Sequence, residues 1–122
     1  MIRGVGTDVV ELDHFADVVD RSKPGFLDYL FTAAEIEYCE RLKNRMASYA
    51  AIFAAKEAFL KALHTGLAPG MRWTDVELVH AKSGAPSVVV HRGCVDLLGS
   101  GTAHVSLTHS TRRAAAVVVI ED

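Results

Sequence analysis

Hydrophobic residues are arranged differently in the two halves of the chain, and the change comes at Trp73. The first half opens with a Val-rich segment, residues 2–12, which predicts a strand interrupted by Gly4 and Gly6. Polar, helix-compatible stretches and apolar residues at helical spacing follow it. From this pattern we expect helices at residues 13–20, 26–30, 33–42 and 45–64.

End signals support the last two of these helices. Thr32 is a good N-cap residue, and Glu35 three positions later completes a T-x-x-E capping box. The long helix 45–64 is followed by Thr65-Gly66, and glycine readily takes the left-handed conformation that ends a helix.

After Trp73 the pattern is that of short strands separated by turn residues. We expect strands at residues 73–79, 86–91, 103–109 and 114–121, and a short helix at 95–98. Residues 110–113 would join the last two strands as a hairpin. One strand, then helices, then an antiparallel set predicts an α+β fold. We expect a single domain, residues 1–122, in which the long central helix packs on an antiparallel sheet.

Composition narrows the classes of protein. The chain has 122 residues, the size of one domain, with 50% hydrophobic and 23% charged residues. Its net charge of −2 gives no reason to expect a nucleic-acid or membrane surface. The longest apolar run, residues 114–120, is too short to cross a bilayer, and the N-terminus lacks the pattern of a signal peptide. Cys39 and Cys94 belong to no CxxC or His-rich cluster, so we expect free thiols in a cytoplasmic protein.

The long helix raises the first chemical question. Residues 49–63 hold only three charged side chains, Lys56, Glu57 and Lys61. A helix that is apolar all round is usually buried, and a buried charge needs a partner. The four-residue spacing places Glu57 and Lys61 on one face. They could form an ordinary exposed ion pair worth ~0.3–0.5 kcal/mol. Alternatively, Glu57 could bind a metal and Lys61 an anion beside it.

A metal needs a second ligand, and the first strand offers Asp8. Aspartate is depleted inside strands, whereas most neighbours of Asp8 are apolar. Two carboxylates, completed by waters and substrate phosphates, suit Mg²⁺ better than zinc. Glu11 and Asp13 are rival carboxylates. The G-x-G before Asp8 lacks the third glycine and the following helix of a dinucleotide-binding loop.

A second polar row lies in HVSLTHS, residues 104–110. In a strand its even-numbered residues, an imidazole and three hydroxyls, would share one face. That face suits phosphate or ribose oxygens, although a solvated outer face of a sheet has the same pattern. His109 would lie on the other face, among Val and Leu, as a hydrogen-bonded core histidine.

Three motifs together point to a family. GVGTDVVEL near the N-terminus, FAAKEAFLKAL in the middle and HVSLTHS near the C-terminus occur in this order and spacing. The combination resembles the holo-acyl-carrier-protein synthases, which are the small bacterial type of 4′-phosphopantetheinyl transferase. The resemblance covers essentially the whole chain. No single motif is specific, but the combination is.

The resemblance implies an activity and an assembly. Members of the family transfer the phosphopantetheine arm of coenzyme A to a serine of an acyl carrier protein. They require Mg²⁺, release adenosine 3′,5′-bisphosphate and form homotrimers with active sites at subunit interfaces. The family's metal ligands fall on Asp8 and Glu57, and Lys61 falls beside the pyrophosphate, so these three are the expected catalytic residues. The expected coenzyme A contacts are Lys56, Lys61, Arg45, Gly66, Pro86, His104 and Ser106.

Two positions depart from the family pattern. Ile52 stands where the family has an arginine that helps to hold a coenzyme A phosphate. Asp13 and His14 stand where the family's first helix is often basic, which weakens electrostatic docking of an acidic carrier. Two other hypotheses therefore stay open. One is a carrier-protein- or coenzyme A-binding module without catalysis. The other is a different Mg²⁺-dependent phosphotransferase acting on nucleotides, although no P-loop or kinase motif supports it.

Overall fold

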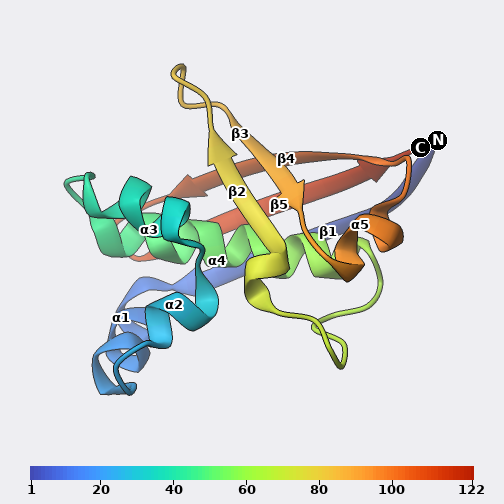
Figure 1. The fold of residues 1–122 in the computed structure, drawn as a ribbon. Coiled ribbons are helices and arrows are strands. Elements are labelled where there is room, and N and C mark those ends of the chain that lie inside the picture. Colours follow the sequence, from blue (N-terminus) through green and yellow to red (C-terminus); the bar gives the residue numbers. More distant parts are fainter.

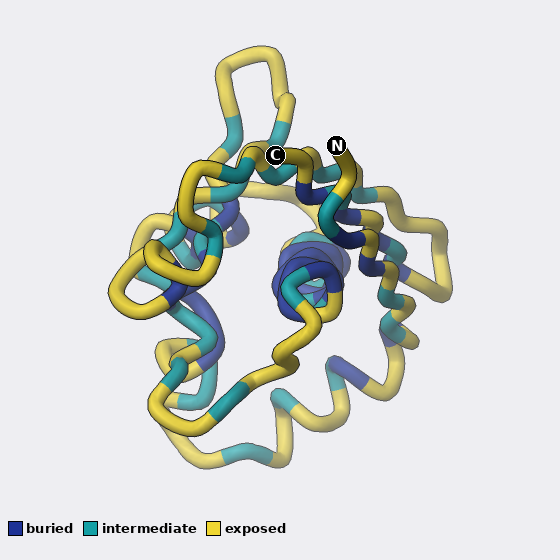
Figure 2. Tube along the Cα trace, turned by 90° about the vertical axis from the view of Figure 1, so that its right-hand side faces the viewer, coloured by how far each residue is buried: buried dark blue, intermediate teal, exposed yellow.

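The computed structural model describes every residue from Met1 to Asp122, and helix α4, Arg45–Ala62, runs through its middle (Figure 1). Of its 18 residues 12 are buried, so the helix has no wide solvent-facing side. In Figure 2, turned by 90°, the rest of the chain surrounds this helix. The prediction of a buried long helix is confirmed.

The other elements follow the predicted order around α4. Strand β1 opens the chain, three short helices lead to α4, and two hairpins with one more helix follow it. Their bounds are β1 Ile2–Glu11, α1 Leu12–Arg21, α2 Phe26–Leu30, α3 Ala33–Glu40, the 3-10 helix η1 Trp73–Asp75, β2 Val76–His80, β3 Pro86–Val90, α5 Gly93–Leu98, β4 Thr102–His109 and β5 Arg113–Glu121.

Strands β1, β5 and β4 form an antiparallel sheet in that order, with β5 in the centre. Alternate residues of β5, Ala114, Ala116, Val118 and Ile120, are buried on the side of α4. Asp8 is paired with Ala116 in the register, so it belongs to the same side. The sheet thus presents Asp8 toward the central helix.

Strands β2 and β3 form a second, two-stranded sheet, whereas the sequence predicts a single antiparallel sheet. The N–H of Leu78 in β2 donates to a carboxylate oxygen of Glu35 at 2.8 Å instead of to another strand. The predicted strand 73–79 also begins later, at Val76. Asp75 caps the preceding 3-10 turn by accepting the N–H of Arg72 at 3.0 Å.

The capping box before α3 is present as predicted. The Thr32 hydroxyl accepts the N–H of Glu35 at 3.2 Å, and the Glu35 carboxylate accepts the N–H of Thr32 at 2.8 Å. The helix itself ends at Glu40, two residues earlier than predicted. Together the buried hydrophobic residues of helices and sheets form one cluster around α4.

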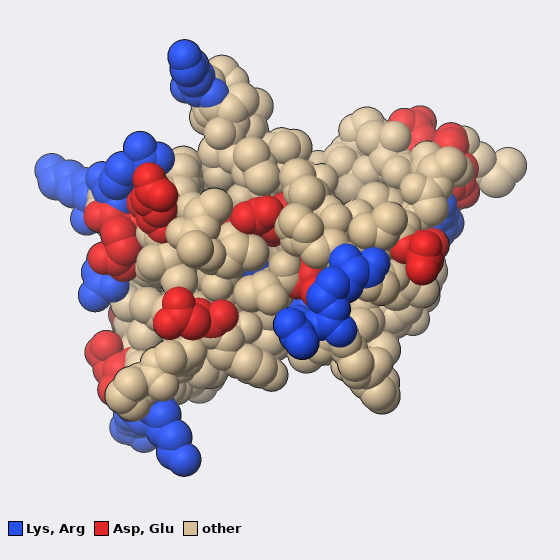
Figure 3. Space-filling view, viewed as in Figure 1, with Lys and Arg blue, Asp and Glu red and all other residues tan.

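The surface carries both signs of charge. On the face shown in Figure 3, acidic and basic side chains are interspersed, and neither sign covers it continuously. None of the helices combines the length and the apolar character needed to cross a membrane.

Candidate active site

Close contact between α4 and β1 brings the predicted catalytic residues together. A Cβ added to Gly6 would lie 1.8 Å from the carbonyl oxygen of Ala58, and one added to Gly4 would lie 2.0 Å from that of Ala62. Backbone can touch backbone here only because the strand has glycine at both positions. This contact sets the distance between Asp8 on β1 and the turn of α4 that carries Glu57 and Lys61.

Lys61 reaches across this contact to β1. Its ammonium donates to the carbonyl oxygen of Thr7 at 3.0 Å and to Asp8 Oδ1 at 3.2 Å. The Lys61 side chain is 52% exposed and that of Asp8 is 19% exposed, so the pair lies at an opening to solvent. An incoming anion could therefore reach the ammonium.

Glu57 completes the cluster. Burial raises the pKa of Glu57, the negative charge of Asp8 raises it further, and the positive charge of Lys61 opposes these effects. No hydrogen bond within the chain occupies the Glu57 carboxylate. Asp8, Glu57 and Lys61 thus lie together, and the two carboxylates are close enough to repel each other.

The two rival carboxylates, Glu11 and Asp13, do not join Asp8 and Glu57. Glu11 bonds to Arg113, with 2.7 Å between Glu11 Oε1 and Arg113 Nε. Asp13 is exposed on α1. No cluster of three or more His, Cys, Asp or Glu side chains is arranged to hold a metal ion. Asp8 and Glu57 could therefore supply two oxygen ligands, and a bound cation would need its other ligands from water or substrate.

The structure corrects the prediction for Lys56. It was expected to contact coenzyme A, but its side chain is 0% exposed and its ammonium lies 2.7 Å from Glu35 Oε1. Burial lowers the pKa of Lys56, and the nearby charge of Glu35 opposes that shift. The helical period places Lys56 about 100° away from Glu57, toward α3 and the β2–β3 hairpin. It belongs to the core and not to a substrate surface.

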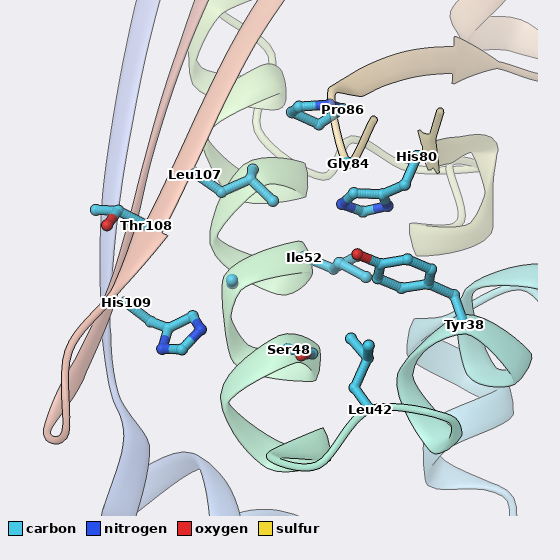
Figure 4. A pocket seen from close by; sticks show the side chains of 11 residues that line it. Tyr38, Leu42, Ser48, Ile52, His80, Gly84, Pro86, Leu107, Thr108 and His109 are labelled. Carbon is cyan, nitrogen blue, oxygen red and sulfur yellow. The ribbon is translucent and has the colours of Figure 1, made fainter. Parts of the chain in front are cut away.

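A cavity of about 250 Å³ lies on that other side of α4 (Figure 4). Ile52 and Ser48 of α4 line it together with Tyr38 of α3. The β2–β3 hairpin and β4 supply the facing walls, through His80, Gly84, Pro86, Leu107, Thr108 and His109. The cavity thus joins the predicted Pro86 to the HVSLTHS strand.

A second cavity, of about 360 Å³, opens beside Asp8 between β1, α1 and α2. Its walls are mostly apolar and include Phe15, Phe26, Leu30 and Phe53. His14 and Glu11 also line it. This cavity offers an apolar contact surface next to the carboxylate pair.

Comparisons with known proteins decide the family. Residues 4–118 match the model of the 4′-phosphopantetheinyl transferase superfamily. A curated protein of Geobacter sp. (strain M21), named holo-[acyl-carrier-protein] synthase, is 41% identical over 124 residues, and the match covers 99% of each chain. The chain belongs to the 4′-phosphopantetheinyl transferase superfamily.

Solved structures of superfamily members share the fold. A holo-(acyl-carrier-protein) synthase from Bacillus anthracis str. Ames, in complex with CoA (3′,5′-ADP), superposes with a TM-score of 0.84 at 30% identity. The match covers 100% of this chain and 98% of that one. The Helicobacter pylori holo-[acyl-carrier-protein] synthase in complex with coenzyme A gives a TM-score of 0.86 at 28% identity, over 96% and 99% of the two chains.

The remaining residues predicted from the superfamily resemblance are spread over the surface. Ser106 lines a shallow hollow on the sheet together with Asp8. His104 Nε2 lies 3.0 Å from Glu121 Oε1. Arg45 begins α4 and its guanidinium donates to Glu40 at 3.1 Å. Gly66 follows α4 in a left-handed conformation, with φ of 58°. Ser106 is paired with Val117 in the register, so its side chain lies on the outer face of the sheet, whereas that of Asp8 lies on the side of α4. The structure therefore brings none of these four side chains to Asp8.

Two features of the cavity at Ile52 were not predicted from the sequence. His109 is exposed and lines the cavity at Ile52, so the prediction of a hydrogen-bonded core histidine is wrong. Strand β4 ends at His109, and the elements packed on the sheet no longer cover this side chain. The sequence also does not reveal the stacked rings of Tyr38 and His80, whose centroids lie 4.0 Å apart. No local pattern links α3 to β2, so only tertiary structure shows this pair.

Proposed function

We propose that this chain is a holo-acyl-carrier-protein synthase. It transfers 4′-phosphopantetheine from coenzyme A to a serine hydroxyl of an apo acyl carrier protein and releases adenosine 3′,5′-bisphosphate. The observation that carries the proposal is the convergence of Asp8, Glu57 and Lys61 at the contact between β1 and α4. It occurs in a superfamily member whose full-length relative bears the synthase name.

Asp8 and Glu57 fit a magnesium ion. The charge of Asp8 raises the pKa of Glu57, which means that the two carboxylates repel each other when both are ionised. Oxygen ligands from two carboxylates, completed by water and phosphate, are what Mg²⁺ prefers. Bound there, Mg²⁺ would supply positive charge. That charge would stabilise the negative charge that develops as the phosphoanhydride bond of coenzyme A breaks.

Lys61 adds a fixed positive charge beside the leaving group. Negative charge grows on adenosine 3′,5′-bisphosphate as the phosphoanhydride breaks, and a positioned ammonium is most effective where charge develops. The half-exposed Lys61 side chain is tethered to Thr7 and Asp8, so it is oriented before substrate arrives. Lys61 therefore acts mainly on the rate of transfer.

Two groups could accept the proton of the carrier serine: a water held at the cation site, or the Glu57 carboxylate. A serine hydroxyl is a weak nucleophile, so a nearby group must accept its proton as it attacks. No hydrogen bond within the chain occupies the Glu57 carboxylate. We expect the serine oxygen to attack the phosphate that carries pantetheine directly, in line with the leaving adenosine 3′,5′-bisphosphate. Trapping a phosphopantetheinylated enzyme residue would contradict this mechanism.

The nucleotide part of coenzyme A is assigned to the cavity at Ile52. Pro86, expected to contact coenzyme A, lines this cavity. Ile52 itself is only 2% exposed. The missing family arginine is therefore replaced by packing, and phosphate binding must depend on other cations.

The carrier protein is assigned to the apolar cavity beside Asp8. Helix α1 forms one wall of it but carries three aspartates, and its Arg21 pairs with Asp17 at 3.1 Å. Attraction for an acidic carrier would be weak at this helix, so docking would rely on the apolar walls.

The outer face of the three-stranded sheet supports a homotrimer. Val5, Val9 and Val117 are 54%, 60% and 37% exposed on this face. Contiguous exposed valines on a sheet are a common mark of a protein–protein interface. In such a trimer the active sites would lie at subunit interfaces, since Asp8 belongs to the edge strand β1 of the same sheet. A cytoplasmic location fits the two free cysteines, Cys39 and Cys94.

One experiment tests the proposed function. The protein is incubated with coenzyme A, Mg²⁺ and a panel of purified apo carrier proteins, and the intact mass of each carrier is measured. We expect at least one carrier to gain the mass of one phosphopantetheine. Carrier or coenzyme A binding without any mass gain across the panel would contradict the proposal and favour a binding module.

A further inference from the structure

A fully buried ion pair lies outside the proposed reaction. The ammonium of Lys56 is 2.7 Å from Glu35 Oε1, and both side chains are 0% exposed. Burying two charges costs more free energy than burying apolar side chains of the same size, unless every polar atom is satisfied. The chain therefore has a reason to keep this pair other than simple filling of the core.

The pair is the centre of a hydrogen-bonded network. Glu35 Oε1 also accepts the N–H of Thr32 at 2.8 Å, and Glu35 Oε2 accepts the N–H of Leu78 at 2.8 Å. The Lys56 ammonium donates to the carbonyl oxygen of Trp73 at 3.1 Å. One carboxylate and one ammonium thus tie together α3, α4, η1 and β2.

The segments that the network holds form a wall of the cavity at Ile52. The β2–β3 hairpin is a separate two-stranded sheet, so no strand of the main sheet holds it by a ladder of hydrogen bonds. Leu78 lies two residues before His80, which lines the cavity with Gly84 and Pro86 from the same hairpin. Fixing Leu78 and Trp73 to α4 therefore sets the position of this wall.

The catalytic residues are held by a different contact. Asp8 and Lys61 meet where Gly4 and Gly6 of β1 touch the backbone of α4. No hydrogen bond of the Lys56–Glu35 network reaches β1. Helix α4 thus makes two separate connections, one to the sheet that carries Asp8 and one to the hairpin that walls the cavity.

We propose that Lys56 and Glu35 are positioning residues that hold the β2–β3 wall against α4 and thereby set the affinity for coenzyme A. This inference rests on the proposed function, because it takes the cavity at Ile52 as the nucleotide site. It predicts that the network controls substrate binding, whereas the β1–α4 contact controls the chemical step.

The test uses a variant that removes both charges together. Lys56→Met/Glu35→Gln leaves no lone buried charge, and the glutamine keeps one acceptor for a backbone N–H. We expect the KM for coenzyme A, and its Kd by calorimetry, to rise at least about tenfold, because a small displacement of a binding wall is costly. The kcat and the KM for the carrier should stay within about threefold of wild type.

A matched control separates positioning from general stability. Ile120 is 0% exposed on β5 and packs on the same helix, away from the network. Ile120→Ala should lower the melting temperature but leave the KM for coenzyme A unchanged. The inference is overturned if the double variant keeps wild-type KM and Kd, or if Ile120→Ala raises the KM by the same factor.

A measurement on the wild-type protein tests the inference even if the double variant fails to fold. If the wall and the ligand are coupled, coenzyme A must stabilise the network by the same factor that the network stabilises binding. Hydrogen exchange of the Leu78 amide should therefore slow on adding coenzyme A. Unchanged exchange under saturating coenzyme A would overturn the inference. Failure of the wild type to modify any carrier would instead contradict the proposed function.

Discussion

Glu35, Glu40 and Glu57 have the same side chain, and their surroundings give them different properties. Glu35 is buried, and its oxygens accept from Lys56, Thr32 and Leu78. Glu57 has a raised pKa because of burial and the charge of Asp8. Glu40 is exposed, and its pKa is lowered because it accepts a hydrogen bond from Tyr49 and lies beside Arg45. Only Glu57 combines a raised pKa with a free carboxylate at the opening.

Glu40 permits a test of this electrostatic assignment. Its folded pKa lies below the ordinary value of 4.5, so its ionised form stabilises the fold above that pH. The contribution is lost as pH falls through the lower folded pKa. We expect Glu40→Gln to lower the melting temperature at neutral pH, and this difference to shrink as the pH falls below the ordinary value of 4.5 and through the lower folded pKa.

The control for this titration lies on the same helix. Glu37 is exposed and makes no hydrogen bond or ion pair, so Glu37→Gln should not reproduce the effect. A melting-temperature difference for Glu40→Gln that stays constant from neutral to acid pH would contradict the assignment.

At the scale of elements, the β1–α4 contact matters most for the site. Gly4 and Gly6 let the strand approach Ala62 and Ala58 more closely than any side chain would allow. The same spacing keeps Lys61 within hydrogen-bond distance of Thr7 and Asp8. Stability and catalysis therefore depend on the same pair of elements.

Gly6→Ala tests this contact. The new Cβ would lie 1.8 Å from the Ala58 carbonyl oxygen, and the helix must move away. We expect a loss of about 3 kcal/mol in the free energy of unfolding. Transfer activity should fall strongly even below the new melting temperature, because Lys61 leaves Asp8. Gly93→Ala is the control, since nothing lies within 4 Å of a Cβ there. Equal effects of both substitutions, measured by thermal unfolding and carrier modification, would contradict the contact's role.

Elements with local signals were predictable from the sequence. The capping box of Thr32 and Glu35 marks the start of α3 as predicted. The predicted end of α4 is wrong: the helix ends at Ala62, and His64, not Gly66, takes the left-handed conformation directly after the C-cap Leu63. The spacing of Glu57 and Lys61 likewise predicts a shared face. The face of α4 that carries Lys56 was not predictable, because its partner Glu35 lies 21 residues away. The separate β2–β3 sheet depends on the same long-range bond from Leu78.

The candidate site likewise combines residues that have a local sequence signal with features that only the tertiary structure reveals. Asp8 stands out as an aspartate in a Val-rich strand, but its direct ion pair with Lys61 was not predicted from the sequence. The cavity at Ile52 needed tertiary structure, since its walls come from α3, α4, the hairpin and β4. His109 was misplaced because strand alternation says nothing about where the covering layer ends.

At the scale of the whole molecule, the proposed trimer can be tested at the outer face of the sheet. Val117 lies on the central strand and is 37% exposed. Val117→Lys would place a charge inside the interface, so we expect monomers by sedimentation and loss of transfer activity. Val95→Lys on α5, at a site 49% exposed, should leave the assembly intact. A wild-type protein that sediments as a monomer and is active would contradict the trimer.

The most direct measurement is the rate of mass gain of an apo carrier protein with coenzyme A and Mg²⁺, compared between wild type, Asp8→Asn and Glu57→Gln. Both substitutions keep the shape of the side chain and remove its charge. We predict one added phosphopantetheine per carrier with wild type, and rates lower by about 100-fold or more with either variant. Near-wild-type rates in either folded variant would contradict the assignment of the site.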